Sequence, residues 1–344
     1  MMPPPGRRGY AMPAEWTPHR ATWIAWPHNR EDWPDKFGPI PWAYAEMVRV
    51  LSRNERVCIL VQTPALRTQA KAALKMNGVD LKKVDFHLVP TDRVWTRDSG
   101  AIFVRNAAGE KIATHWKFNG WAKYPNHKRD DRVAPRIAAA AGVPEYPVQV
   151  GNREIVMEGG AIDVDGKGTL MATEECLLSK VQARNPGLGR AGIEAAFADV
   201  LGIRRVVWLD RGIAGDDTHG HIDDLARFVA PGRVLLCRES NPKDENYKPL
   251  KINLERLRAA KVDVIPLPMP APVVFDGLRV PASYANFYIA NGTVIVPTFN
   301  DPKDRVALGL IADCFPGREV VGIHCGDFIW GLGTLHCATQ QEPA

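Results

Sequence analysis

Apolar residues recur along this chain in two alternating patterns, one with the spacing of helices and one with that of strands. The helical spacing predicts helices at 41–51, 66–76, 192–200 and 254–260. Runs of β-branched and other apolar residues follow these helices, and they predict strands at 57–61 and 206–209. Helices and strands therefore alternate along the sequence, so the predicted fold class is α/β.

A weak internal repeat accompanies this alternation. In each copy a polar residue precedes alternating apolar positions, and turn dipeptides such as Asn291-Gly292 lead into a second strand. The copies begin at Trp95, Glu158, His221, Ser283 and Gly333, the last covering only 333–337. They recur at roughly 50 to 65 residues, a spacing typical of propeller-like arrays. If five such units close around an axis, each delivers one polar loop to the centre, carrying in turn Asp98, Glu158, His221 with Asp223, Asn286 and Cys337.

The composition of the chain restricts its possible functions more than its possible folds. The 344 residues show no low-complexity linker, so we expect a single domain over 1–344, with residues 1–11 as a flexible N-terminal extension. Hydrophobic residues make up 45% of the chain, which is ample for a core. The formal charge of +5 is spread along the sequence, which gives no support to nucleic-acid or membrane binding.

Two features bear on the cellular compartment. No apolar run of signal-peptide length follows the first residues, and no later stretch approaches a membrane span, so we expect a cytoplasmic protein. The six cysteines, at positions 58, 176, 237, 314, 325 and 337, lie far apart without a Cys-x-x-Cys pair. This spacing fits reduced thiols better than a disulfide framework or a zinc knuckle.

Cys337 directly follows a stretch punctuated by glycines, where the backbone can turn tightly. An isolated cysteine is most often an inert buried thiol. Here, however, the segments 95–98 and 216–224 supply carboxylates and an imidazole, the groups that a cysteine nucleophile would use. Cys337 is therefore the candidate nucleophile.

A site with three carboxylates, an imidazole and a thiol is suited to a cation, because buried carboxylates without a partner are costly. A guanidinium matches carboxylates in bidentate geometry, and Asp98 with Asp223 or Glu158 would hold its central carbon against a sulfur. Attack by Cys337 would release ammonia, with His221 as the proton donor, and would leave a covalent amidino-thioether. The same imidazole would then take a proton from the water that releases a ureido product.

Nine short segments, some of which carry these residues, are distinctive when taken together: 12–19 with 23–27, 95–100, 118–121, 158–160, 173–178, 217–223, 281–288 and 336–341. In these segments the chain resembles the agmatine deiminase and peptidylarginine deiminase-like family of guanidino-group hydrolases, nearly end to end. The resemblance implies a five-bladed, pseudo-symmetric α/β propeller, the pentein fold, with a central active site. It also implies no metal or organic cofactor, and these roles: catalysis by Cys337 with His221, and guanidinium binding by Asp98, Glu158 and Asp223.

The resemblance further implies a substrate class. We expect agmatine, a small cationic guanidino compound, to be deiminated to N-carbamoylputrescine and ammonia, in polyamine metabolism and putrescine biosynthesis. Peptidylarginine, free arginine or another guanidino compound is the alternative substrate. We expect the substrate to contact Trp95, Trp121, Asn286 and Gly333. The family also suggests a homo-oligomer.

Two segments depart from the family pattern. Residues 330–335 stand where a run of glycines usually precedes the final His-Cys, and residues 122–131 replace a glycine-rich stretch after Trp121. We expect both segments to shape the tail end of the pocket. The second segment contains Lys123, Lys128 and Arg129. Because these cations could bind a carboxylate, a substrate that carries one is also compatible with the sequence.

Two other functional classes stay open at this point. His219 and His221 with Asp217 and Asp223 also look like zinc or iron ligands, which predicts a metal-dependent hydrolase. A guanidinium-binding module without turnover would leave Cys337 dispensable. Metal content, the effect of chelators and substitution of Cys337 would separate the three classes.

Overall fold

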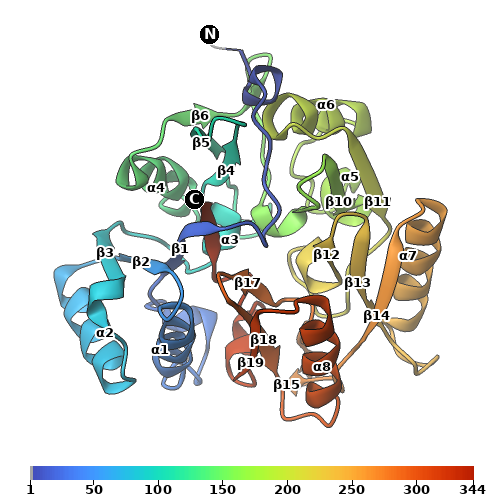
Figure 1. Cartoon of the computed structure of the whole chain (residues 1–344). Helices are drawn as coiled ribbons and strands as arrows, with labels where there is room; N and C mark the ends of the chain where they lie inside the picture. Colours follow the sequence, from blue (N-terminus) through green and yellow to red (C-terminus); the bar gives the residue numbers. More distant parts are fainter. Residues whose placement is uncertain (1–2) are drawn as a thin grey trace.

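Five small sheets of three or four strands form in residues 3–344, the part of the chain that the computed structural model describes. Their strand orders are β4-β5-β6, β9-β10-β11, β12-β13-β14, β17-β18-β19 and β20-β1-β2-β3. In each sheet the first two strands in these orders pair antiparallel and the next strand joins parallel. Figure 1 shows the sheets arranged around the middle of a mixed α/β molecule.

The strands are short, and two further pairs form small hairpins outside these sheets. The sheet strands are β1 His19–Ala25, β2 Arg56–Val61, β3 Val84–Leu88, β4 Ile102–Arg105, β5 Lys111–His115, β6 Glu145–Pro147, β9 Asp163–Val164, β10 Thr169–Thr173, β11 Arg205–Leu209, β12 Ala226–Ala230, β13 Arg233–Arg238, β14 Asp263–Pro268, β17 Tyr288–Ala290, β18 Thr293–Thr298, β19 Glu319–His324 and β20 Gln340–Pro343. The hairpins pair β7 Gln149–Val150 with β8 Arg153–Glu154, and β15 Val274–Phe275 with β16 Leu278–Arg279.

Helices connect the parallel strands, because a parallel pair needs a crossover rather than a tight turn. The α-helices are α1 Ile40–Leu51, α2 Pro64–Met76, α3 Thr96–Ser99, α4 Val133–Ala141, α5 Glu174–Leu178, α6 Arg190–Leu201, α7 Tyr247–Ala259 and α8 Asp304–Cys314. Helix α2 begins where Pro64 follows Thr63, whose hydroxyl accepts the N–H of Leu66 at 3.1 Å. Helix α6 ends at Gly202, which has a φ of 68°.

The predicted helices and strands are largely confirmed. The ranges 41–51, 66–76 and 192–200 lie within α1, α2 and α6, and the two predicted strands lie within β2 and β11. Helix α7 begins earlier than predicted, at Tyr247. The predicted strand-like unit at 333–337 is wrong, because this segment forms turns and the last strand, β20, begins only at Gln340.

Residues 5–11, expected to form a flexible extension, make contacts that a free extension would lack. The 3-10 helix η1, Pro5–Arg8, packs on α6, and Arg7 Nε lies 2.7 Å from Asp199 Oδ1. The N–H of Ala11 donates to the carbonyl of Arg105 at 3.0 Å. Residues 1–2 lie outside the described residues.

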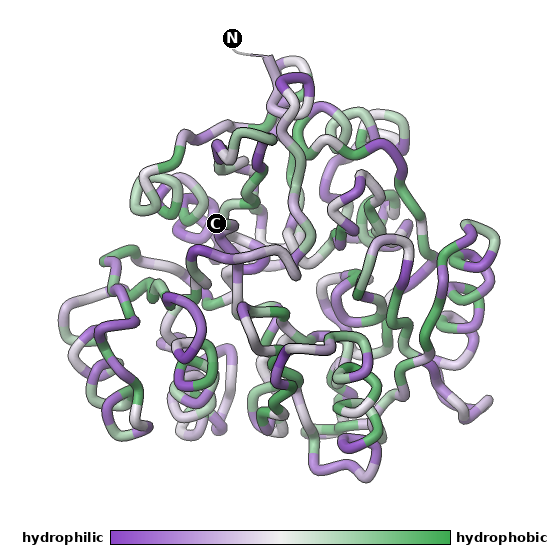
Figure 2. Tube along the Cα trace, viewed as in Figure 1, coloured by the Kyte–Doolittle hydropathy of each residue, from purple (hydrophilic) through white to green (hydrophobic). Residues whose placement is uncertain are grey.

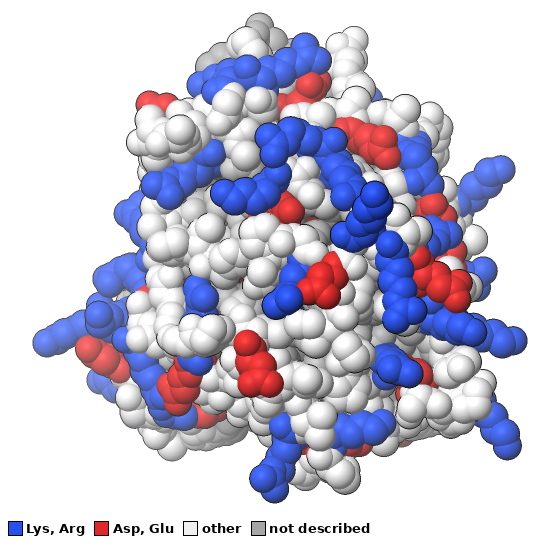
Figure 3. Space-filling view, turned by 45° about the vertical axis from the view of Figure 1, so that its right-hand side comes forward, with Lys and Arg blue, Asp and Glu red and all other residues white. Residues whose placement is uncertain are grey.

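The hydropathy pattern follows this architecture. Figure 2 shows apolar and polar positions alternating along the turns of the helices, as expected for helices with one face on the core. Figure 3 shows Lys and Arg side chains distributed over one face with Asp and Glu between them. Within residues 3–344, no helix has both the length and the apolar character needed to cross a bilayer. All six cysteines are free.

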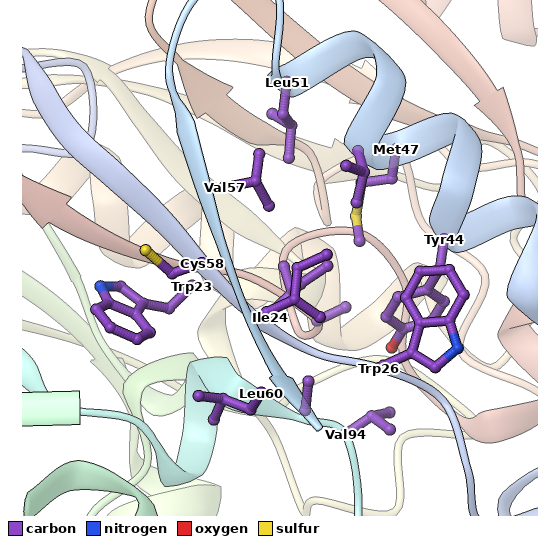
Figure 4. Packing of buried hydrophobic residues seen from close by; sticks show 14 of the residues in the cluster. Trp23, Ile24, Trp26, Tyr44, Met47, Leu51, Val57, Cys58, Leu60 and Val94 are labelled. Atoms are coloured by element: carbon purple, nitrogen blue, oxygen red, sulfur yellow. The ribbon is translucent and has the colours of Figure 1, made fainter. Parts of the chain in front are cut away.

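Strands β1 and β2 show how the core is built. Figure 4 shows Ile24 and Val57 facing the apolar side of α1, which presents Tyr44 and Met47. Trp23 and Cys58 lie on the other side of the same strands, because successive side chains of a strand point to opposite faces. All of these side chains are buried. Both faces of this sheet are therefore covered, which explains its nearly continuous apolar sequence.

Candidate active site

Cys337 lies in the turn that precedes β20, and contacts on both sides fix its backbone. β20 pairs with β1, and the carbonyl of Cys337 accepts the N–H of Arg97 at 3.2 Å. Before the cysteine, the chain passes so close to Trp95 that only a glycine fits. A Cβ at Gly333 would lie 2.9 Å from the Trp95 ring and 3.1 Å from the Cβ of Cys337.

The thiol of Cys337 is surrounded by polar groups. Its Sγ lies 3.0 Å from Asn286 Nδ2, which donates to it, and 3.6 Å from Asp223 Oδ2. Burial, together with the charges of Asp223, Asp224 and Asp98, holds the thiol pKa well above its usual value, although the Asn286 hydrogen bond acts in the opposite direction. The thiol is therefore protonated at neutral pH while no cation is beside it.

The imidazole of His221 is buried among three carboxylates. Its Nδ1 lies 3.8 Å from Asp98 Oδ1 and 3.9 Å from Asp223 Oδ1, and its Nε2 lies 3.7 Å from Glu158 Oε2. Burial alone would lower the His221 pKa, but the negative charge of Asp98 and the contact with Glu158 outweigh it and raise that pKa well above its usual value. His221 is therefore a cation near neutral pH. Asp223 contacts both the imidazole and the thiol of Cys337.

Asp98 sits in the one-turn helix α3, and two donors hold its carboxylate. Its Oδ1 accepts the N–H of Gly160 at 3.0 Å, and its Oδ2 accepts Trp121 Nε1–H at 2.9 Å. Burial raises the pKa of Asp98 to about 6, since it outweighs the favourable charge of His221. A Cβ at Gly160 would lie 2.6 Å from His221 Nδ1, so the close approach of these groups requires glycine at this position.

Glu158 and Asp223 are kept ionised by separate partners. Burial alone would raise the pKa of Glu158, but Arg184, whose Nε lies 3.1 Å from Glu158 Oε1, helps to lower it to about 2. Burial likewise opposes ionisation of Asp223, and the hydrogen bond from His336 Nδ1 at 2.6 Å lowers its pKa. The two carboxylates therefore carry full negative charge next to Cys337 and His221.

Two of these buried carboxylate oxygens have no donor among the described residues. They are Glu158 Oε2 and Asp223 Oδ1, and both lie beside His221. A buried acceptor without a donor costs about 1–3 kcal/mol, and more when it is charged. A guest that brings several N–H groups and a positive charge would satisfy both oxygens.

A pocket of about 430 Å³ leads to the thiol. Trp95, Trp121, Gly333, Asp98 and Cys337 line it, as do members of both segments that depart from the family pattern: Lys123, Tyr124, Trp330, Gly331 and Leu332. The other lining residues come from several loops: Glu31, Asp32, Pro34, Arg93, Gly215, Asp217, Thr218, Leu278, Arg279 and Val280. Asn286, expected to contact the substrate, is not among these lining residues, and its amide contacts Cys337, Asp223, Asp224 and Thr334.

Several site residues escaped the sequence analysis. His336 bridges two buried carboxylates, because its Nδ1 contacts Asp223 and its Nε2 lies 2.8 Å from Glu15 Oε2. Two features of the sequence could have indicated His336. It directly precedes Cys337, and its partner Glu15 lies in segment 12–19. Arg184 gave no comparable signal, and Cys176 appeared only as a member of segment 173–178.

The ligand set of the metal-dependent alternative does not gather in the described part of the chain. His219 Nε2 contacts Ser179 Oγ at 3.3 Å, and Asp217 accepts hydrogen bonds from Tyr124 and Lys123. Neither residue belongs to the two groups of three side chains that are close enough to share an ion. The loop that carries them turns sharply, with a φ of 67° at His219 and 95° at Gly220, and of the four candidate ligands His221 and Asp223 lie in the site.

Comparison with known proteins places this geometry in context. Residues 11–343 match the model of a family described as Porphyromonas-type peptidyl-arginine deiminase. The agmatine deiminase of Ectopseudomonas mendocina is 35% identical over 369 aligned positions, covering 99% of this chain and 97% of that protein.

Solved structures resemble the chain over nearly its full length. The agmatine deiminase of Enterococcus faecalis superposes with a TM-score of 0.91 at 30% identity, covering 100% of this chain and 98% of that one. A substrate-bound cysteine-to-serine variant of the C. jejuni agmatine deiminase superposes with a TM-score of 0.87 at 28% identity, covering 97% and 96%.

Proposed function

Because this chain belongs to the Porphyromonas-type peptidyl-arginine deiminase family, we propose that it is an agmatine deiminase. This hydrolase acts on a C–N bond of a linear amidine and converts agmatine and water to N-carbamoylputrescine and ammonia. The observation that carries the proposal is the buried thiol of Cys337 at the end of one pocket, in contact with Asp223, which is one of three carboxylates around the His221 imidazole.

The guanidinium binds where the buried carboxylates lack donors. Glu158 Oε2 and Asp223 Oδ1 accept its N–H groups, and Asp98 adds a third negative charge. The ring of Trp95 lies against Gly333 and Cys337 and forms a flat wall beside the reacting carbon. Arrival of this cation lowers the thiol pKa, so the substrate helps to ionise its own nucleophile.

The thiol of Cys337 loses its proton to solvent, and the thiolate attacks the central guanidinium carbon and forms a C–S bond. The tetrahedral adduct expels ammonia once His221 has transferred a proton to the leaving nitrogen, and an amidino-thioether remains on Cys337. His221, now neutral, takes a proton from a water that attacks the same carbon. Collapse of the second adduct breaks the C–S bond, regenerates Cys337 and releases the ureido product.

Charge along the pocket favours agmatine over free arginine. Three basic side chains line the pocket, and each is paired with a carboxylate: Arg93 with Asp32, Lys123 with Asp217, and Arg279 with Asp244. No basic group of the described lining is thus left for the α-carboxylate of arginine, whereas agmatine has no carboxylate that needs such a partner. Peptidylarginine, free arginine or another guanidino compound stays the alternative substrate.

The broader expectations belong to the same proposal. Each of the five sheets with its crossover helix forms one blade of a pseudo-symmetric α/β propeller, with the active site at the centre of a single domain over 1–344. The protein acts in the cytoplasm on a small molecule, as a homo-oligomer, without a metal or organic cofactor.

The test is a substrate panel of agmatine, arginine, a blocked arginine peptide and a shorter guanidino acid, with ammonia and ureido product both measured. We expect agmatine to give the highest kcat/KM. Asp217→Asn should shift the ratio of kcat/KM values toward arginine, because it removes the carboxylate that neutralises Lys123. The control is Asp301→Asn, because Asp301 is not among the residues that line the pocket. Asp216→Asn, on the same loop as Asp217, is unsuitable because Asp216 accepts the N–H of His221. Absence of ureido product from all four compounds would refute the proposal.

A further inference from the structure

A second buried thiol, Cys176, lies next to the imidazole of His221 and the carboxylate of Glu158. One ligand atom from each of the three side chains lies within 4.8 Å of the other two. Both ring nitrogens of His221 and the Oε2 atom of Glu158 have no hydrogen-bond partner among the described residues, although they are fully buried. We propose that Cys176, His221 and Glu158 form a zinc-binding site whose occupation inhibits the enzyme.

The donor atoms are those that zinc prefers, and their spacing is near that of a tetrahedral ion. Zn–N and Zn–O distances of about 2.0–2.2 Å place tetrahedral ligands roughly 3.3–3.6 Å apart. His221 Nε2 and Glu158 Oε2 are 3.7 Å apart. The sulfur, within 4.8 Å of both side chains, therefore has to move by roughly 1.4 Å or less to complete the set.

Hydrogen bonds of Thr173 fix the backbone of Cys176 relative to the loop that carries His221. The hydroxyl of Thr173 accepts the N–H of Cys176 at 3.0 Å and donates to the carbonyl of Gly220 at 2.5 Å. Gly220 directly precedes His221, so one side chain ties helix α5 to the loop that carries the imidazole. Support of this kind keeps ligands in place before the ion arrives.

A competing group of Asp223, Asp224 and Cys337 is less suited to the ion. Asn286 Nδ2 already lies 3.4 Å from Asp223 Oδ2, 2.9 Å from Asp224 Oδ1 and 3.0 Å from Cys337 Sγ. A metal there would displace the amide from all three groups. At the proposed site Arg184 contacts Glu158 Oε1, the oxygen that the ion does not need.

The ion would reach this site by the pocket that leads to Cys337. Asp98 lines that pocket, and its Oδ1 lies 3.8 Å from His221 Nδ1. Zinc on His221 and Glu158 removes the proton donor and one guanidinium acceptor, so it competes with substrate. This inhibition rests on the proposed function, whereas the binding of zinc does not.

The binding test uses Cys337→Ala protein, which removes the other active-site thiol. Titration with Zn²⁺ by calorimetry, and with Co²⁺ by its thiolate charge-transfer absorption, should show one ion per chain and release of two protons, one from the Cys176 thiol and one from the His221 imidazolium. Adding Cys176→Ser should weaken binding by at least about tenfold. Adding Cys237→Ser instead should leave it unchanged, because that buried thiol contacts Ser283 away from the site and serine preserves the contact.

The inhibition test compares zinc inhibition of the protein with all six cysteines and of Cys176→Ser, each relative to its own rate without zinc. We expect competition with agmatine and a rise of at least about tenfold in the inhibition constant of the variant. No binding, or binding that survives Cys176→Ser, overturns the zinc site whatever the activity. Zinc binding that depends on Cys176 supports the site even if the protein does not hydrolyse agmatine.

Discussion

Replacing Asp98 with asparagine tests the electrostatic account of the site with almost no change in shape. The carboxylate accepts two hydrogen bonds, from Gly160 N–H and Trp121 Nε1–H, and its charge faces His221 at 3.8 Å. An amide offers one oxygen and turns its NH₂ group toward one of the two donors. The substitution therefore removes the charge that pairs with a guanidinium and also misplaces one donor.

The magnitude follows from the burial of the site. Removing one partner of a buried charge pair costs about 3–5 kcal/mol. At about 1.36 kcal/mol per tenfold change in rate, Asp98→Asn should lower kcat/KM for agmatine by roughly two to nearly four orders of magnitude. The lost hydrogen bond is contained in this range and is not added to it, because both effects act through one side chain.

Two variants make the measurement decisive. Trp121→Phe removes one donor, leaves the Asp98 charge and keeps an aromatic ring in the pocket, so its main cost should be the hydrogen bond to a charged group, about 1.5–3 kcal/mol. Asp165→Asn makes the same chemical change in a turn, where the carboxylate accepts the N–H groups of Lys167 and Thr169 outside the pocket, and it should leave kcat/KM unchanged. Steady-state ammonia release gives the kinetics, and thermal melting checks the fold. The reasoning would be refuted by a folded Asp98→Asn protein whose kcat/KM lies within threefold of the parent value. A loss of kcat/KM in Trp121→Phe that exceeds the loss in Asp98→Asn would also refute it.

Three further outcomes are expected. Cys337→Ala and Cys337→Ser should abolish turnover without lowering Tm greatly, and His221→Ala quenched with agmatine should show an adduct on Cys337 by mass spectrometry; parent-like rates in Cys337→Ala would exclude the covalent mechanism. The kcat/KM for agmatine should fall as the pH drops through about 6, since burial raises the pKa of Asp98 to about 6 and the free enzyme must hold it ionised; a flat profile well below that pH contradicts this role. Chelators should not slow the enzyme and alkylation of Cys337 should stop it, whereas activity that survives complete alkylation, with a tightly bound metal found by elemental analysis, would establish a metallohydrolase instead.

Helices were the most predictable part of the fold, because their signal is local. The buried positions of α1, including Tyr44, Met47, Val48 and Leu51, repeat every three or four residues, and this is visible in the sequence alone. The prediction for segment 333–337 was wrong because it also used only a local pattern. The segment alternates like a strand, but the close packing of Gly333 against Trp95 forces a turn. No local pattern records a constraint imposed by a side chain more than two hundred residues away.

The chemistry of the site was more predictable than its supporting contacts. Cys337, His221, Asp98, Asp223 and Glu158 stood out because their residue types are costly to bury without a purpose, and the structure brings all five together. The pairing of Glu158 with Arg184 could not be predicted in this way, since arginine is common and its partner is chosen only when the loops meet. The same holds for Asn286, whose amide was expected to face the substrate and instead holds the thiol.

Different neighbours set the pKa values of the three carboxylates. The net charge that results affects the pKa of the Cys337 thiol. Arg184 keeps Glu158 ionised and His336 keeps Asp223 ionised, whereas the pKa of Asp98 stays raised to about 6. The surplus of negative charge raises the pKa of the Cys337 thiol, so the nucleophile is protonated and unreactive while the pocket holds no cation. A guanidinium offsets that surplus at the moment it comes within reach of the sulfur. In the proposed reaction, selectivity for a cationic substrate and activation of the nucleophile therefore have one electrostatic cause, and a neutral isostere of agmatine should neither bind tightly nor promote alkylation of Cys337 by a small reagent.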